Sequence, residues 1–324
     1  MPLLDARPLD TGIDFVASER SPRVAVIAVD AASLDFIARA TAEGRLPNFG
    51  RILDAGAVMH LATIHPTSAE AVWAAVATGK LPLKNGVRSA GIYHLATGGD
   101  SLQLLPDYCF ANQLVRFGFL VQEPHTSATL RARALWSILS THGLSVGTVA
   151  WPLTQPTPVV RGYIVGDSYL KLAGTPTGIV DSPAVFPGDI QMDVARAAAR
   201  ALAEAPAVPA DARALEQRHE GPGRADRAYD RIARDLADEH SPQVTLTRYQ
   251  GLDAIGHYFL RYALPLEFGD VADDEHRALG DVLERHYRLI DDAVGRAIQG
   301  LGPDDLLLVV SGYGMEPMGL ARRL

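Results

Sequence analysis

Short apolar runs recur along the chain, and most of them are followed by a stretch with helical periodicity. The runs are rich in β-branched residues and end at turn residues, as in the segment RVAVIAV. The run LLLVV is apolar at every position, which is typical of a strand covered on both faces. Strands are expected at residues 23–29, 57–64, 144–150, 244–249 and 306–310.

The stretches between these runs have apolar residues at steps of three and four, the spacing of one buried helix face. Strands that alternate with helices predict an α/β fold with an open, mostly parallel sheet and helices on both faces. The segment 226–239 carries opposite charges at helical spacing and is expected to present a solvated face. Helices are expected at residues 34–43, 49–55, 70–77, 134–142, 193–205, 226–239 and 275–299.

Two regions interrupt this alternation. Residues 91–129 have little periodic structure, and residues 165–241 are rich in proline, alanine and charge. Both are expected to be insertions on the core sheet, of a kind that can cover a site. We therefore predict a single α/β domain over residues 20–324, preceded by an N-terminal extension at residues 1–19.

The composition argues against proteins that bind nucleic acids, are held by disulfides or span membranes. The chain has 324 residues, 48% of them hydrophobic, and a formal net charge of −8, so we expect a large core and no basic surface for nucleic acids. The single cysteine, Cys109, cannot form an intramolecular disulfide. No apolar run approaches the roughly 20 residues of a membrane span. We expect a cytoplasmic protein that binds neither membranes nor nucleic acids.

Polar residues follow the expected strands at their carboxyl ends, where open α/β sheets bind ligands. The first strand ends at Asp30, in the segment AVIAVDAAS. This turn lacks the Gly-x-Gly-x-x-Gly pattern, so it is not expected to bind a nicotinamide or flavin nucleotide. Asp30 is a candidate ligand, although an aspartate at this place can also simply cap the next helix.

The run at 57–64 leads to Thr67 and Ser68 at the expected start of a helix. A helix N-terminus offers unpaired N–H groups and a positive dipole end, which suit a phosphate. The alternative is purely structural, because Thr67 and Glu70 match a capping box. Trp73, on an apolar face of the same helix, is expected in the core.

A second candidate site follows the strand at 244–249. Asp253 and His257 are four residues apart and can converge on one ion, and such oxygen and imidazole ligands suit Zn²⁺ or Mn²⁺. Gly256 is expected to give the backbone freedom to turn. The alternative is a chance pair, since this spacing is common. We expect Asp30, Asp253 and His257 to lie along one edge of the sheet, with Thr67 nearby.

Several segments in this order resemble the type I phosphodiesterase/nucleotide pyrophosphatase family of the alkaline phosphatase superfamily. They are VIAVDA, LPNFGRILDAGA, HPTSAEAVWAAVATGKLPLKNGV, YQGLDAIGHYF and LLLVVSGYGM. The resemblance implies an alkaline-phosphatase-like fold and hydrolysis of phosphate esters with two metal ions, commonly zinc. It further implies that Asp30 serves one metal and that Asp253 with His257 serves the other.

The chain departs from the pattern of this family at three places. Ala69 stands at the usual nucleophile position, so Thr67 or Ser68 would have to attack instead. Gly312 and Tyr313 stand where the family has Asp and His. The chain also ends before the position of the family's remaining metal-binding histidine, and we expect the sequence to be incomplete at its C-terminus.

Two hypotheses about function follow from this pattern. The first is a metal-dependent hydrolase of phosphate mono- or diesters that uses zinc, or alternatively manganese. The second is a catalytically impaired relative that binds a phosphorylated ligand or a partner protein. An oxygen at position 69 would have favoured the first hypothesis, and its absence keeps the second open.

Overall fold

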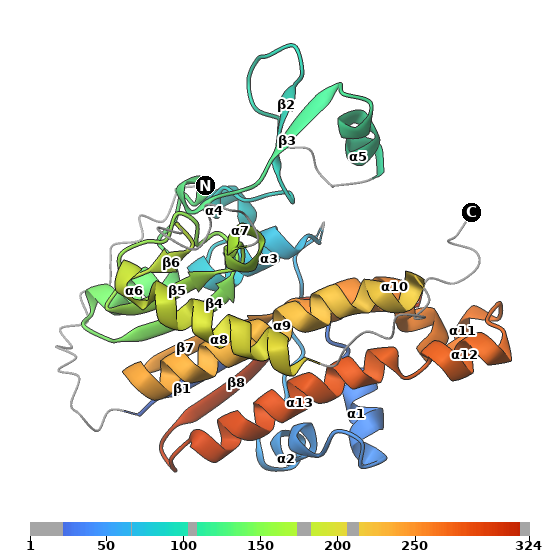
Figure 1. The fold of residues 1–324 in the computed structure, drawn as a ribbon. Coiled ribbons are helices and arrows are strands. Elements are labelled where there is room, and N and C mark those ends of the chain that lie inside the picture. The colour runs from blue at the N-terminus through green and yellow to red at the C-terminus, as the bar shows by residue number, and fades with distance from the viewer. Residues whose placement is uncertain (1–21, 66, 103–108, 174–182, 206–213, 318–324) are drawn as a thin grey trace, which may run out of the picture.

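The computed structural model describes residues 22–65, 67–102, 109–173, 183–205 and 214–317. The expected N-terminal extension lies outside these ranges. The core is a six-stranded sheet in the order β6-β5-β4-β7-β1-β8, parallel except for β6 (Figure 1). This arrangement confirms the predicted α/β class. The strands are β1 (Val24–Val29), β4 (Val146–Trp151), β5 (Gly162–Gly166), β6 (Val185–Phe186), β7 (Val244–Tyr249) and β8 (Leu306–Ser311).

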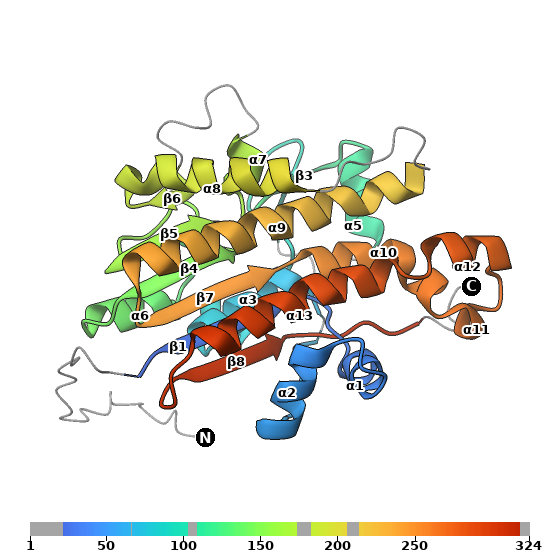
Figure 2. The same cartoon turned by 60° about the horizontal axis from the view of Figure 1, so that its bottom comes forward.

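Helices cover both faces of this sheet, as expected. Trp73 and Trp136, from α3 (Ala69–Thr78) and α6 (Leu135–Thr141), pack on one face around Leu246. The opposite face is covered by α8 (Gln191–Glu204), α9 (Ala214–His240) and α13 (Val282–Gly300), and Figure 2 shows these three helices in front of the sheet.

The register of the central strands sets the position of the site. Val29 of β1 lies opposite Tyr249 of β7 and Ser311 of β8. These three strands therefore end at the same level, and the residues after them meet at one edge. The helix α10 (Gly251–Ala263) begins there, directly after β7.

Smaller elements surround the core. The antiparallel pair of β2 (Ile92–Leu95) and β3 (Leu120–Glu123) stands apart from the main sheet, together with α5 (Cys109–Arg116), at the top of Figure 1. The remaining elements are α1 (Leu34–Ala42), α2 (Pro47–Ala55), α4 (Pro82–Asn85), α7 (Tyr169–Ala173), α11 (Pro265–Phe268), α12 (Asp273–Leu279) and two 3-10 turns, η1 (Ser127–Thr129) and η2 (Gly188–Ile190). No helix in the described ranges is both long and apolar enough to span a membrane.

Two local predictions were wrong. Residues 57–64 form no strand, and Met59 is 78% exposed. β8 is the last strand of the sheet, and none of the described strands pairs with its outer edge. Residues 57–61 and 63 line a cavity beside the end of β8 instead of pairing with it, and the side-chain hydroxyl of Thr63 donates a hydrogen bond to the backbone just after β8. The helix expected at 275–299 is two helices, α12 and α13, with Gly280 at the break, because glycine is a poor helix former.

Several helices receive their N-terminal caps from distant elements. The carboxylate of Asp291 in α13 accepts the N–H groups of Asn48 and Phe49 at the start of α2. The carboxylate of Asp226 in α9 accepts the N–H groups of Gln250 and Gly251 at the start of α10. The first four N–H groups of a helix have no partner within it, so these contacts fix where each helix begins.

Candidate functional site

Charged residues gather at the carboxyl edge of the sheet. Asp30 follows β1, Asp167 follows β5, and Tyr313 follows β8. Arg248 is in β7, and Asp253 is in the first turn of α10. The charges of Asp30 and Arg248 act on the carboxyl of Asp253, so these groups form one electrostatic cluster.

Asp30 is at the centre of this cluster and is only 2% exposed. Its Oδ1 accepts the Nε–H of Arg248 at 2.9 Å and the indole N–H of Trp73 at 2.7 Å, while its Oδ2 accepts an Nη2–H of Arg248 at 2.6 Å. Two parallel bonds between a guanidinium and a carboxylate are the strong form of this ion pair. Trp73 is fully buried, as expected of a core residue, but its indole also has this polar role.

Arg248 is on the face of β7 that packs against α3, in line with Val244 and Leu246. Its guanidinium also lies 3.7 Å from the carboxylate of Asp167. Burial alone would lower the pKa of Arg248, but the charge and hydrogen bonds of Asp30 raise it above the usual value. Arg248 is therefore a fixed cation inside the site.

Asp253 and His257 lie on successive turns of α10. Oδ1 of Asp253 is 3.8 Å from Nδ1 of His257, and the two side chains are 35% and 70% exposed. The same ring nitrogen is 3.0 Å from the backbone oxygen of Asp253, so the imidazole is held along the helix. Gly256 is in the interior of α10 rather than at a turn, contrary to expectation. A Cβ there would lie 2.0 Å from Cε of Met315, so glycine leaves room for that side chain.

The carboxyl of Asp253 gives a testable pH dependence. Burial raises its pKa, and so does the charge of Asp30, although His257 and Arg248 act in the opposite direction. Since the folded-state pKa is above the unfolded one, the contribution of Asp253 to stability is greatest at acidic pH and is lost as pH rises through the folded pKa. We expect metal-free Asp253→Asn to be more stable than the parent at pH 7, by under about 1 kcal/mol because solvent screens the group.

Urea unfolding at pH 7 and pH 3.5 measures this difference. The gain from Asp253→Asn should be smaller at pH 3.5 than at pH 7, because acid protonates the parent carboxyl and removes the cost of burying its charge. An equal gain at both pH values would contradict a raised pKa. Asp274→Asn, an exposed change in α12, is the matched control.

The N-terminus of α3 holds the candidate nucleophiles. Oγ of Ser68 accepts the N–H of Ala71 at 3.4 Å, so Ser68 is the N-cap, rather than Thr67 as a capping box with Glu70 would require. The hydroxyl of Thr67 donates to the carbonyl of Ile64 at 2.9 Å. Ala69 is the first residue of the helix and packs against the tryptophan cluster on this face.

Gly312 and Tyr313 close the cluster on the β8 side. A Cβ at Gly312 would lie 2.3 Å from a methyl group of Val72 in α3, and the carbonyl of Gly312 accepts the hydroxyl of Thr63 at 2.7 Å. Burial raises the pKa of the Tyr313 hydroxyl, and the negative charges of Asp30 and Asp253 raise it further. The phenol is therefore neutral at physiological pH.

The close approach at Gly312 predicts a sensitive position. Gly312→Ala should lower the free energy of unfolding by about 1–3 kcal/mol, because a buried β-branched neighbour cannot move aside freely. Gly314→Ala is the control, since a Cβ there would be 3.6 Å from its nearest neighbour. Chemical denaturation of both variants measures the difference, and equal stabilities would contradict the close packing of Gly312 on Val72.

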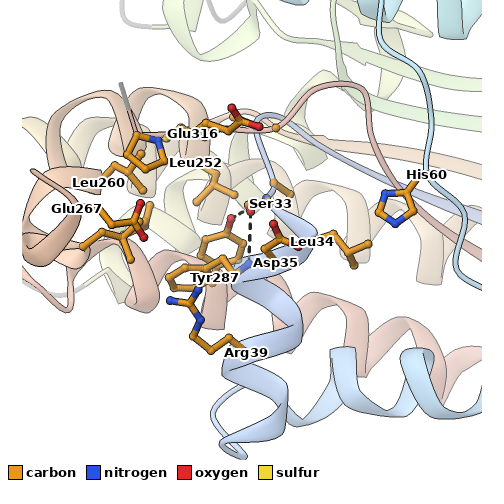
Figure 3. Close-up of a pocket in the computed structure, with 18 residues that line it drawn as sticks. Ser33, Leu34, Asp35, Arg39, His60, Leu252, Leu260, Glu267, Tyr287 and Glu316 are labelled. Carbon is orange, nitrogen blue, oxygen red and sulfur yellow. Dashed lines mark hydrogen bonds between the residues drawn. The ribbon is translucent and has the colours of Figure 1, made fainter. Parts of the chain in front are cut away.

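A cavity of about 550 Å³ opens beside the cluster. Its lining includes residues that directly follow Asp30, together with Leu252 of α10, Tyr287 of α13 and Met315. Figure 3 shows Leu252, Leu260 and Tyr287 along its wall, with the charged Asp35, Arg39, Glu267 and Glu316 around them. The ring of Tyr287 stacks on Phe36 at 4.3 Å between centroids. The cavity thus combines an apolar wall with mixed charges.

The sequence of the chain matches a known protein family. Residues 24–323 match the family described as type I phosphodiesterase / nucleotide pyrophosphatase. The chain belongs to this family. The match covers the strands, the cluster at their carboxyl ends and the helices that carry it, and it confirms the resemblance inferred from sequence. No curated protein sequence matches the chain.

Two solved structures show the same fold. Both are of phosphonoacetate hydrolase from Sinorhizobium meliloti 1021, in complex with phosphonoformate and with phosphonoacetate. Each is 16% identical to this chain, with a TM-score of 0.52 over 92% of it. The chain spans only 57% of the length of those structures.

The two metal ions implied by the family resemblance fit the described residues only in part. No group of three or more His, Cys, Asp or Glu side chains within those residues is placed to hold a metal ion. Asp30 already accepts three N–H groups from Arg248 and Trp73. Asp253 and His257 offer two donor atoms on one exposed helix face. Within the described residues, α10 thus offers two ligand atoms, and the carboxylate of Asp30 is engaged by Arg248 and Trp73.

Two residues of this cluster, Arg248 and Asp167, were not predicted from the sequence. Arg248 had a usable signal, because it alternates with Val244 and Leu246 and therefore lies on a buried face of a central strand. A charge in such a position requires a partner. Asp167 had no comparable signal, since β5 itself was not predicted.

Proposed function

We propose that this chain is a hydrolase of phosphate mono- or diesters, with its reaction centre between the N-termini of α3 and α10. Family membership over residues 24–323 is the observation that carries this proposal. The position of the cluster supports it, because ligands of open α/β sheets bind at the carboxyl ends of the strands. The substrate is a small phosphorylated molecule.

One divalent metal ion, zinc or manganese, is proposed to bind between Asp253 and His257. The 3.8 Å separation of their donor atoms and the exposure of the imidazole support this placement. When bound, the ion would neutralise charge on the phosphoryl group. For Nδ1 of His257 to bind the ion, the hydrogen bond between this nitrogen and the backbone oxygen of Asp253 must first break.

The remaining roles belong to residues of the chain itself. The positive dipole end of the α3 N-terminus would attract phosphoryl oxygens. The hydroxyl oxygen of Thr67 or Ser68 would attack the phosphorus atom while the P–O bond to the alcohol of the ester breaks, and the hydroxyl proton would pass to the departing alcohol. Water would then hydrolyse the phosphorylated side chain and restore its hydroxyl. The hydroxyl oxygen of Ser68 accepts the N–H of Ala71, whereas the hydroxyl of Thr67 donates to the carbonyl of Ile64. The cavity of Figure 3 would take the organic part of the substrate.

A second candidate function is binding without catalysis. Ala69 has no oxygen, and the carboxylate of Asp30 is engaged by Arg248. These two observations favour a relative that retains the cleft and has lost the chemistry. Such a protein would bind a phosphorylated ligand at the same edge, or a partner protein.

Hydrolysis assays distinguish these two functions. Aryl phosphate mono- and diesters are offered with Zn²⁺ or Mn²⁺ to the parent and to Thr67→Ala, Ser68→Ala and Asp253→Ala. We expect Asp253→Ala to lower kcat/KM by about 100-fold or more, and one of the two hydroxyl variants to lose about as much. Asp274→Ala, a change at an exposed position of α12, should stay within about twofold.

Two other outcomes would contradict the proposed hydrolase or the location of its active site. Turnover that none of the three variants reduces would refute the location of the active site. Absence of turnover, together with calorimetric binding of the same esters that Asp253→Ala weakens, would favour the binding function.

A further inference from the structure

Most of the hydrogen-bonding capacity of the Asp30 carboxylate is used by donors from this chain. A carboxylate has about four lone-pair sites, and three of those of Asp30 are taken by two N–H groups of Arg248 and the indole N–H of Trp73. All three contacts are between 2.6 and 2.9 Å. Asp30 and Arg248 are 2% and 6% exposed, so solvent contributes little to either group.

The guanidinium of Arg248 is also held from its other sides. Its carbon lies 5.8 Å from the ring centroid of Trp73, and its Nη1 faces the carboxylate of Asp167 at 3.7 Å. The backbone of Arg248 is fixed as well, because β7 lies between β1 and β4 in the sheet. These contacts together restrict the guanidinium to one orientation, in which it binds both carboxylate oxygens of Asp30.

Gly312 and Tyr313, which follow β8, bring no carboxylate or imidazole to Asp30. Gly312 has no side chain, and even a Cβ there would lie 2.3 Å from Val72. Tyr313 brings a neutral phenol next to Asp30, where burial and negative charges raise its pKa. A metal ion at Asp30 would therefore have to displace Arg248 and find its other ligands elsewhere.

We propose that Arg248 is the resident cation of Asp30 and that Asp30 is not a metal ligand in this chain. The ion pair joins β1, β7 and α3 at the carboxyl edge of the sheet and balances the charge that a metal would otherwise balance. Metal binding is then restricted to the exposed pair on α10. This inference does not depend on the proposed hydrolysis, because it concerns folding and metal stoichiometry.

A double-mutant cycle on the full chain tests the pair by thermal unfolding. The proteins are the parent, Asp30→Asn, Arg248→Met and the double variant, each in EDTA and in Zn²⁺. Each single change leaves a buried partner unpaired and should lower Tm by about 5 °C or more, by the same amount in EDTA as in Zn²⁺. The double variant should lose several degrees less than the sum of the singles, because the two residues act as one unit.

Asp167→Asn is the matched control, since it removes the more distant of the two carboxylates beside Arg248. It should lower Tm by less than half as much as Asp30→Asn does. Metal analysis after dialysis against Zn²⁺ should give at most one ion per chain, and Arg248→Met should not reduce that number.

The proposal is overturned if Asp30→Asn lowers Tm in Zn²⁺ but not in EDTA, because Asp30 would then act through a metal. Additive single and double changes would overturn it as well. Should Asp30→Asn fail to fold, Arg248→Met and the parent still decide the question. A parent whose Tm falls in EDTA and an Arg248→Met variant with unchanged Tm would together contradict the proposal.

Discussion

Replacing Asp226 with alanine is expected to lower the free energy of unfolding by about 4 kcal/mol. Asp226 is 0% exposed, and its carboxylate has three partners. Oδ1 accepts the N–H of Gln250 at 3.1 Å, and Oδ2 accepts the N–H of Gly251 at 2.9 Å and lies 3.0 Å from Nε2 of His286. Alanine would leave two backbone donors and a buried imidazole without an acceptor, where water cannot replace it.

Loss of this cap would also disturb the candidate site, because Asp253 and His257 are both in α10. The negative charge of Asp226 also lies at the positive end of the α10 dipole. Equilibrium urea unfolding compares Asp226→Ala with Asp238→Ala, an exposed aspartate on the same helix α9. The control should change stability by about 0.5 kcal/mol or less. Similar losses in the two variants would show that the cap does not stabilise the start of α10.

Hydrophobic patterning predicted the central sheet because its signal is local. The runs that became β1, β4, β7 and β8 lie within two residues of the predicted bounds. Pairing is not local, and this explains the failure at 57–64. The outer edge of β8 has no partner among the described strands, yet residues 57–64 do not pair with it. The apolar character of a run therefore does not by itself specify which strand it pairs with.

Charge patterning failed on α9 for a related reason. The segment 226–239 has the opposite charges of a solvated helix, yet Asp226 and Asp230 are buried. Asp230 pairs with Arg234 in the same segment, but the other partners of the two aspartates are on β7, α13 and the start of α10. The segment alone therefore does not indicate which aspartates point inward. Whether such a polar residue is buried, and which distant element it caps, depends on how the helices and strands are arranged. The sequence shows only that the residue is acidic.

The candidate site was partly predictable for the same physical reasons. Asp30 and Asp253 could be placed at one edge because parallel strands share their carboxyl ends. The partner of Asp30 was not identified, since a family pattern with two metals suggests a cation from solution. The alternation of Val244, Leu246 and Arg248 already implied a cation built into β7.

The second large effect is expected at Asp291, which caps α2 from the neighbouring helix α13. Oδ1 accepts the N–H of Phe49 at 2.7 Å, and Oδ2 accepts the side-chain amide of Asn48 at 2.9 Å. The N-cap position of α2, Leu46, has no side-chain acceptor, and Pro47 has no N–H to satisfy. Asp291 is therefore the acceptor for the first available donors of α2, and it is 3% exposed. Asp291→Ala should lower the free energy of unfolding by about 3 kcal/mol.

Asp292→Ala provides a closely matched control, because it removes the next carboxylate along α13 from an exposed position. We expect a change of about 0.5 kcal/mol or less for this control. Hydrogen exchange should also show faster exchange of the amides of α2 in Asp291→Ala than in Asp292→Ala, since the cap fixes the first turn of that helix. The Asp226 cap is at the start of a different helix, so exchange in α10 should change little. Equal exchange of α2 in the two variants would mean that packing on the core, rather than the carboxylate of Asp291, determines where α2 begins.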